Sequence, residues 1–256
     1  SIVSGGTGAF SSAAAANATF TADAYGVYVL RWTISNGVCT ASTADVTVTF
    51  FESPVVSNAG AAQNLCNVTN TTLAGNDPTP GTGLWTLVSG PNTPAITTPT
   101  AYNSTVTSMV PGVYVFKWTI SNGVCTPSES TVTITNYATP TTAVAGADQN
   151  LCGTLVSAGL GANTPANGTG AWSIVSGGTG TFSSAAAANA TFTADAYGVY
   201  VLRWTISNGV CAASTDDVTV TYYESPTTAT VGANQNVCAA LVSAGLGANT
   251  PTVGTG

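Results

Sequence analysis

The chain has 256 residues, of which 44% are hydrophobic and only 5% are charged, and its formal net charge is −7 with no histidine. Disordered segments combine low apolar content with high charge, so this composition argues for folded domains. With three cations there is no basic patch for phosphates, and no apolar run approaches the roughly eighteen residues of a membrane helix, so we expect neither nucleic acid as a partner nor membrane insertion in this segment.

The predicted elements are short strands. In chain order, residues 27–50 contain a strand, an Asn-Gly pair and a second strand, and residues 84–88 and a Thr-rich run ending near Val106 follow. The Ala-rich run at 13–16 is too short for a helix and lies between Ser and Asn residues. No helical period of useful length occurs, so the chain is predicted to be all-β.

The clearest strand covers residues 113–120. Its residues alternate so that one face carries four apolar side chains, namely Tyr114, Phe116, Trp118 and Ile120. Asn122-Gly123 then predicts a tight hairpin turn, and 131–135 supplies the partner strand. The same pattern recurs at 199–222. Strands at this density in a unit of 86 residues predict a two-sheet sandwich.

An internal repeat of 86 residues organises the chain. It relates the cysteines, tryptophans and prolines of three series: Cys39, Cys125, Cys211; Trp32, Trp118, Trp204; and Pro54, Pro140, Pro226. We predict two complete immunoglobulin-like repeats, at 53–138 and 139–224. They are flanked by the C-terminal part of one repeat, at 1–52, and the N-terminal part of another, at 225–256.

Alternate repeats are nearly identical. Residues 1–52 match 173–224 with five differences, which are Ala9/Thr181, Thr40/Ala212, Ala44/Asp216, Phe50/Tyr222 and Phe51/Tyr223. Such duplication is tolerated most easily where copies add length. The expectation is a window on a long array, with a second interpretation in which the two part-domains complete each other between neighbouring molecules.

Particular motifs resemble a known family. Pro111-Gly112-Val113-Tyr114, leading into Trp118-Thr119-Ile120-Ser121-Asn122-Gly123, resembles the penultimate strand of PKD-like and other immunoglobulin-like domains. The runs at 146–152, 168–172 and 204–211 resemble repeats of very large Bacteroidota surface proteins, including gliding-type adhesins. In repeats 1 and 3 the Pro-Gly is replaced by Tyr-Gly. The resemblance implies tandem PKD-like sandwiches in an elongated array, an extracellular or cell-surface location, and a spacer or adhesive role.

Six cysteines without histidine or a Cys-x-x-Cys motif predict disulfides in an oxidising compartment. Because the first strand of such sandwiches commonly runs beside the last, we expect pairing within each repeat, which leaves Cys39 and Cys238 without partners in this chain. A linkage across repeats, beginning with Cys39 to Cys66, is the alternative. The expected pairs are Cys66 with Cys125 and Cys152 with Cys211.

No catalytic residue, metal ligand or cofactor site is predicted. Without histidine there is no Ser-His-Asp or Cys-His arrangement, and Asp45 corresponds to Thr131 in the middle repeat. Scattered surface acids are the favoured interpretation; a calcium site would lie near Glu52 or Glu224. Three cations, Arg31, Lys117 and Arg203, share one repeat position, where we expect a structural charge or an ion pair rather than a ligand contact.

Two functions remain open. The leading hypothesis is a stalk or filament segment of a secreted bacterial adhesin, with adjacent repeats as partners and Pro-containing links that restrict bending. The rival is a repeated carbohydrate-binding module for a surface glycan, in which Trp85 and Trp172 would stack on sugars, although their apolar neighbours favour a core position. A variant of the first is a self-assembling filament subunit that neighbouring copies complete.

Overall fold

The computed structural model describes residues 1–255. The chain divides into two compact units, Ser1–Asn136 and Tyr137–Gly256. Every regular element in the described residues is a β-strand, which confirms the all-β prediction. Across that same range there is accordingly no helix with the length and apolar character needed to cross a membrane.

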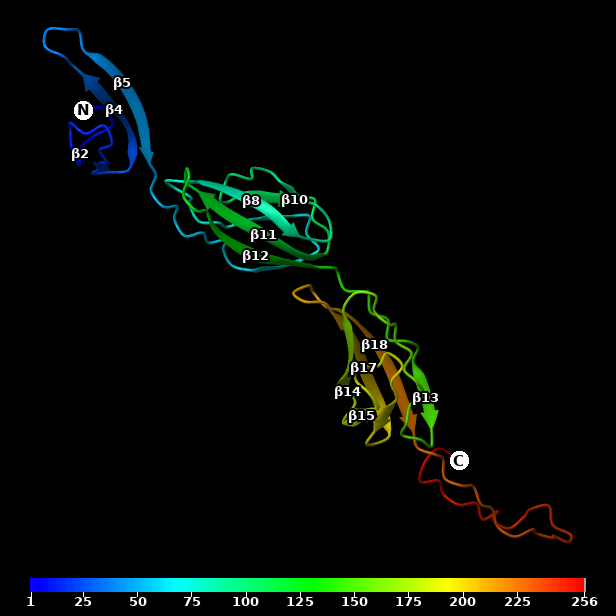
Figure 1. Ribbon diagram of the computed structural model, residues 1–256. Coiled ribbons are helices and arrows are strands. Elements are labelled where there is room, and N and C mark those ends of the chain that lie inside the picture. Colours follow the sequence, from blue (N-terminus) through cyan, green and yellow to red (C-terminus); the bar gives the residue numbers. More distant parts are fainter. Residues whose placement is uncertain (256) are drawn as a thin grey trace. The chain divides into compact units, whose positions relative to one another are not determined.

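The first unit begins with part of a sandwich. Its strands are β1 (Ile2–Ser4), β2 (Gly8–Phe10), β3 (Phe20–Ala22), β4 (Gly26–Ile34) and β5 (Ser42–Phe50). One sheet has the order β1-β4-β5 and the other is the β2-β3 hairpin. The long strands β4 and β5 lie side by side in Figure 1. Tyr28 and Leu30 on β4 are buried between them, but most of β5 is exposed.

A complete sandwich follows in the same unit. Its strands are β6 (Gln63–Cys66), β7 (Asn70–Thr72), β8 (Thr82–Ser89), β9 (Ala95–Ile96), β10 (Thr105–Thr107), β11 (Gly112–Ser121) and β12 (Ser128–Tyr137). A four-stranded sheet, β6-β12-β11-β8, faces a three-stranded sheet, β7-β10-β9. The long strands β8, β11 and β12 lie side by side in Figure 1.

The core of this sandwich contains the apolar side chains on one face of β11. Tyr114, Phe116, Trp118 and Ile120 are all fully buried, because every second residue of a strand points to the same face. The Trp85 ring from β8 packs on Trp118 at a centroid distance of 4.9 Å. The expected apolar face is therefore confirmed.

The second unit contains the other complete sandwich. Its strands are β13 (Gln149–Cys152), β14 (Thr169–Ser176), β15 (Gly180–Phe182), β16 (Phe192–Ala194), β17 (Gly198–Ser207) and β18 (Ser214–Tyr223). The main sheet has the order β13-β18-β17-β14, and β15 pairs with β16 in the opposing layer. The first strand, β13, runs parallel to the last, β18, whereas the other pairs in this sheet are antiparallel.

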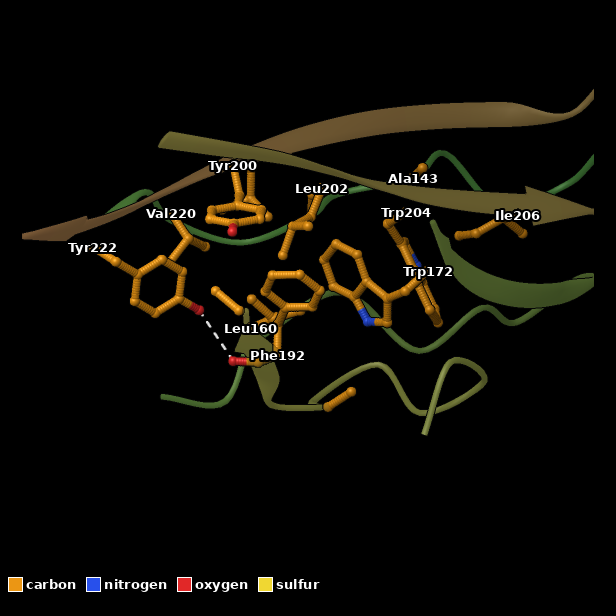
Figure 2. Close-up of a cluster of buried hydrophobic side chains, with 14 residues drawn as sticks. Ala143, Leu160, Trp172, Phe192, Tyr200, Leu202, Trp204, Ile206, Val220 and Tyr222 are labelled. Atoms are coloured by element: carbon orange, nitrogen blue, oxygen red, sulfur yellow. Dashed lines mark hydrogen bonds between the residues drawn. The ribbon is translucent and has the colours of Figure 1, made fainter. Parts of the chain in front are cut away.

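Aromatic side chains fill the space between the two layers of this sandwich (Figure 2). Phe192 lies 5.4 Å from Tyr200 between ring centroids, and Trp172 lies 5.1 Å from Trp204. The Tyr222 hydroxyl donates a hydrogen bond of 3.0 Å to the Phe192 carbonyl, drawn as the dashed line in Figure 2. Buried aromatic pairs of this kind contribute about 0.5–1.5 kcal/mol each beyond their area.

The hairpin connection differs from the predicted tight turn. β11 ends at Ser121 and β12 begins at Ser128, so six residues join them. Gly123 has a positive φ of 54°, but Asn122 does not, and a two-residue turn of the expected type requires both. The Cys125 amide donates to the Asn122 carbonyl over 3.1 Å and closes the loop.

Residues 225–255 contain no strand. They nevertheless form a folded-back segment, in which the Gly232 amide donates to the Leu246 carbonyl over 2.9 Å and the Thr227 amide donates to the Val253 carbonyl over 3.1 Å. The chain is thus a series of tandem immunoglobulin-like β-sandwiches. The exact repeat boundaries, at 52/53, 138/139 and 224/225, stay predictions.

Candidate functional site

The three cations each form an ion pair with an acid on the neighbouring strand. Arg31 donates to both carboxylate oxygens of Asp45, over 2.8 and 2.9 Å, and Arg203 does the same with Asp217, over 2.7 and 2.9 Å. Both acids lie directly opposite their arginine in the β-ladder. The structural interpretation of these cations, as partners of nearby acids, is confirmed.

The middle repeat makes an equivalent pair from another position. Thr131 stands opposite Lys117 in the ladder, but Glu129, two residues earlier on the same face, reaches the lysine with an Nζ–Oε1 distance of 2.9 Å. Glu129 also accepts a hydrogen bond of 3.2 Å from the Thr119 hydroxyl. The middle repeat therefore keeps a cross-strand ion pair although threonine replaces the aspartate at position 131.

These pairs shift acid pKa values in one direction. The hydrogen bonds from Arg31 and Arg203 lower the pKa of Asp45 and of Asp217 below its ordinary value, and the hydrogen bond from Lys117 lowers the pKa of Glu129. All three pairs are solvent-exposed, so their contribution to stability is small and salt-dependent. They give the sheet charged positions without forming a catalytic group.

Other candidate chemistry is scattered. Between residues 1 and 255 there is no cluster of three or more His, Cys, Asp or Glu side chains that could hold a metal ion. Glu52 and Glu224 are exposed. Trp85 and Trp172 are 1% and 4% exposed, so they are core residues, as expected, and offer no face to a sugar.

The structure does build a site that sequence reasoning missed, where the hairpin of each complete repeat contacts the residues that lead into it. In the first unit, the Asn122 side-chain amide donates to the Glu52 carbonyl over 2.9 Å. In the second unit, Asn208 donates in the same way to the Ala138 carbonyl over 2.8 Å. We call each of these arrangements a hairpin latch.

An aromatic ring completes each latch. Phe51 lies against Gly123, and Tyr137 lies against Gly209, so closely that a Cβ on either glycine would be 2.4 Å from a ring carbon. Only glycine fits there, and it also supplies the positive φ of 54° that the turn requires. The sequence signal for this contact is an aromatic residue that recurs at the 86-residue interval, at 51, 137 and 223, together with the Asn-Gly pair of each hairpin.

The latch also holds the hairpin cysteine. The Cys125 Sγ lies 3.5 Å from the Glu52 carbonyl oxygen, and the Cys211 Sγ lies 3.5 Å from that of Ala138. Their distances to the preceding carbonyls, of Phe51 and Tyr137, are both 3.8 Å. The two latches thus agree within 0.1 Å in every such contact.

The predicted disulfide pairing is wrong. Cys66 and Cys211 are disulfide-bonded, but Cys125 and Cys152 are free thiols, so neither predicted pair forms. The first strand does run beside the last, but in parallel, so Cys152 stands opposite Tyr223 at the far end of β18, away from the hairpin that carries Cys211. The ten residues of β18 separate the two ends by about 30 Å, far beyond the reach of a disulfide.

Cys39 and Cys238 are also free thiols, and both are exposed. The disulfide-bonded state of Cys66 and Cys211 indicates an oxidising location outside the cytosol.

Comparison with known proteins gives structural likeness only. No protein-family model matches the chain, and no curated protein matches it either. The PKD domain from the KIAA 1837 protein is 28% identical over 32% of this chain and 85% of its own, with a TM-score of 0.29. A titin fragment, the E-to-A variant of domains I67–I69, is 11% identical over 85% of this chain and 83% of its own, with a TM-score of 0.47.

A third solved structure contains Drosophila OTK extracellular domains 3–5. It is 12% identical over 77% of this chain and 71% of its own, with a TM-score of 0.45. These structures are PKD or immunoglobulin-like domains, the last two in tandem. The assignment of this chain to tandem sandwiches rests on its own sheets and cores.

Proposed function

We propose that this chain is a non-catalytic spacer segment of a large extracellular surface protein, of the kind found as adhesins in Bacteroidota. The tandem sandwiches would hold a terminal binding region away from the cell. The observation that carries this proposal is the hairpin latch, which occurs once in each unit with matching distances. The same contacts recur where the chain leads into each complete sandwich. We therefore expect them to stabilise the tandem array rather than to bind a ligand.

The physical basis is restriction of the links between repeats. Each link would be held by an amide hydrogen bond, an aromatic ring on a glycine and a short Pro-containing segment, at Pro54 or Pro140. Proline fixes its own φ angle and limits the residue before it. A series of such links would behave as a semi-rigid rod.

Electron microscopy of the native protein tests the proposal. The expected result is a thin filament with beads spaced about 35–40 Å apart, the length of strands of about eight residues plus loops. Compact, unextended particles would contradict the spacer role. A glycan array probed with the 256-residue chain distinguishes the spacer role from the carbohydrate-binding alternative, because a spacer should give no saturable sugar binding.

A further inference from the structure

The two hairpin latches contain cysteines in different oxidation states. Cys125 is a free thiol, whereas Cys211 is disulfide-bonded. A thiol can donate its hydrogen weakly to a carbonyl oxygen, but a disulfide sulfur has no hydrogen to donate. Comparison of the two latches therefore shows whether their geometry depends on the thiol hydrogen.

The hairpin sulfur has the same position in both latches. Cys125 Sγ and Cys211 Sγ each lie 3.5 Å from the nearer carbonyl oxygen and 3.8 Å from the other. The backbone turn agrees as well, because each cysteine amide donates over 3.1 Å to the carbonyl of the asparagine three residues earlier. The thiol hydrogen does not set these distances, since they are unchanged where it is absent.

Contacts that involve no sulfur atom set the geometry instead. The Asn208 side chain donates to a backbone carbonyl over 2.8 Å, and the ring of Tyr137 lies against Gly209, whose φ is 54°. In the other latch the bond from Asn122 is 2.9 Å long, and Gly123 has the same φ. Because none of these contacts needs the disulfide, the latch can form before the disulfide does.

The rest of the hairpin loop gives its cysteine little support. The loop of the second unit is 208–213, between the ends of β17 and β18, and Cys211 is its one buried residue. Val210 beside it is 56% exposed. A loop with so few apolar contacts is expected to sample several conformations unless other bonds restrict it. The latch supplies that restriction.

We propose that the hairpin latch positions a cysteine for disulfide formation, with Asn208 and Gly209 placing Cys211 Sγ before the bond forms. The latch removes conformational freedom that the loop would otherwise lose at the moment of bonding. It thereby raises the effective concentration of one thiol at the other. Asn208 and Gly209 are positioning residues, because they act on the sulfur through the loop backbone. This inference goes beyond the spacer role, which does not depend on how the disulfide forms.

The bond forms in two steps when oxidised glutathione is the oxidant. One protein thiolate attacks oxidised glutathione, which gives a mixed disulfide and releases one reduced glutathione. The second protein thiolate attacks the protein sulfur of the mixed disulfide, which closes the protein disulfide and releases the second reduced glutathione. The two protein thiols thus lose two protons and two electrons, which the two reduced glutathiones carry. The latch should act on the second step, because only that step requires two protein sulfurs to meet.

Timed oxidation of the reduced 256-residue chain measures the two steps separately. Oxidised glutathione starts the reaction, N-ethylmaleimide traps the remaining thiols, and mass spectrometry distinguishes thiol, mixed disulfide and protein disulfide at Cys211. Asn208→Asp places a carboxylate oxygen where the amide donor was, beside a carbonyl oxygen. The second step should slow about threefold or more, as the loss of one hydrogen bond implies, and the mixed disulfide should accumulate.

The latch of the first unit provides matched controls. Asn122→Asp makes the same change beside Cys125, and it should leave the oxidation of Cys211 at the rate of the unaltered chain. Gly209→Ala, with Gly123→Ala as its control, repeats the comparison through the ring contact, because a Cβ on either glycine would be 2.4 Å from a ring carbon. In none of the four variants should the mixed disulfide form more slowly.

Nuclear magnetic resonance of the reduced chain tests the order of events. The Tyr137 ring should give nuclear Overhauser contacts to the Gly209 Hα protons whether the disulfide is reduced or oxidised, because the latch precedes the bond. If these contacts vanish on reduction, the latch depends on the disulfide and the proposal is wrong.

The kinetic comparison has its own contradicting outcomes. Equal second-step rates in Asn208→Asp and the unaltered chain would overturn the proposal. Equal slowing by Asn122→Asp would also overturn it, since the effect would then reflect the stability of the whole chain. Native tryptophan fluorescence of the reduced variants establishes that the rates belong to folded chains. None of these results would bear on bead spacing in the native protein.

Discussion

The phenyl ring of Phe51 covers Gly123 so closely that a Cβ on this glycine would lie 2.4 Å from a ring carbon. Gly209 has the same relationship to Tyr137, and the two glycines share a φ of 54°. Gly37, in the part-domain, has a similar φ of 57°, but nothing within 4 Å would meet its Cβ. The three hairpins therefore share a backbone conformation and differ in whether a ring rests on it.

This difference allows the ring contact to be measured. Gly209→Ala should destabilise its hairpin by about 1–3 kcal/mol from backbone strain plus the steric conflict with Tyr137. Gly37→Ala carries the strain alone and is the matched control. Hydrogen exchange of the 207–214 amides should accelerate in Gly209→Ala. This acceleration should exceed that of the 35–42 amides in Gly37→Ala. Equal effects would show that the ring contributes nothing.

A second glycine is required by the core. A Cβ at Gly170 on β14 would lie 2.0 Å from the Trp204 ring, which no small adjustment relieves. Gly170→Ala should destabilise the second complete sandwich by about 1–3 kcal/mol or more, as overpacking does. Ala171→Ser, at the exposed neighbouring position, is the control and should change little. Urea denaturation followed by tryptophan fluorescence compares the two variants, and similar midpoints would contradict the packing argument.

The ion pair of Arg203 with Asp217 predicts a weak acid dependence of stability. The pKa of Asp217 is lower in the folded state than its ordinary value, so the pair stabilises the fold above the unfolded pKa of about 3.9, and the effect is lost as pH falls through the folded pKa. Arg203→Met should return the pKa of Asp217 toward its ordinary value, as followed by carboxyl carbon NMR. The Asp217 titration of the unaltered chain serves as the reference. An unchanged Asp217 titration would contradict the assignment.

The oxidation states of the cysteines can be read by alkylation without reduction. Cys39, Cys125, Cys152 and Cys238 should react with iodoacetamide in the unfolded, monomeric chain, whereas Cys66 and Cys211 should react only after reduction. Mass spectrometry of the peptides provides the measurement. Recovery of a peptide that links Cys66 to Cys125 would contradict this assignment. It would support disulfide pairing within one repeat, which the strand geometry rules out.

The sequence by itself determined the faces of the strands. Alternation on 113–120 placed Tyr114 and Trp118 in the core, and both are fully buried, because a strand exposes its two faces at a fixed period of two. The 86-residue interval established which residues are equivalent. It also assigned Arg31 and Arg203 to one strand position, where each has an acid as its partner.

Only the tertiary structure decided which ends of the strands meet. The cysteine spacing is the same whether the first strand runs parallel or antiparallel to the last, but parallel pairing moves Cys152 to Tyr223 and away from the hairpin. The contact of Phe51 with Gly123 likewise joins residues 72 positions apart that no local periodicity relates. Periodicity records which face a side chain occupies; strand direction and the return path of the chain are set by packing between distant segments.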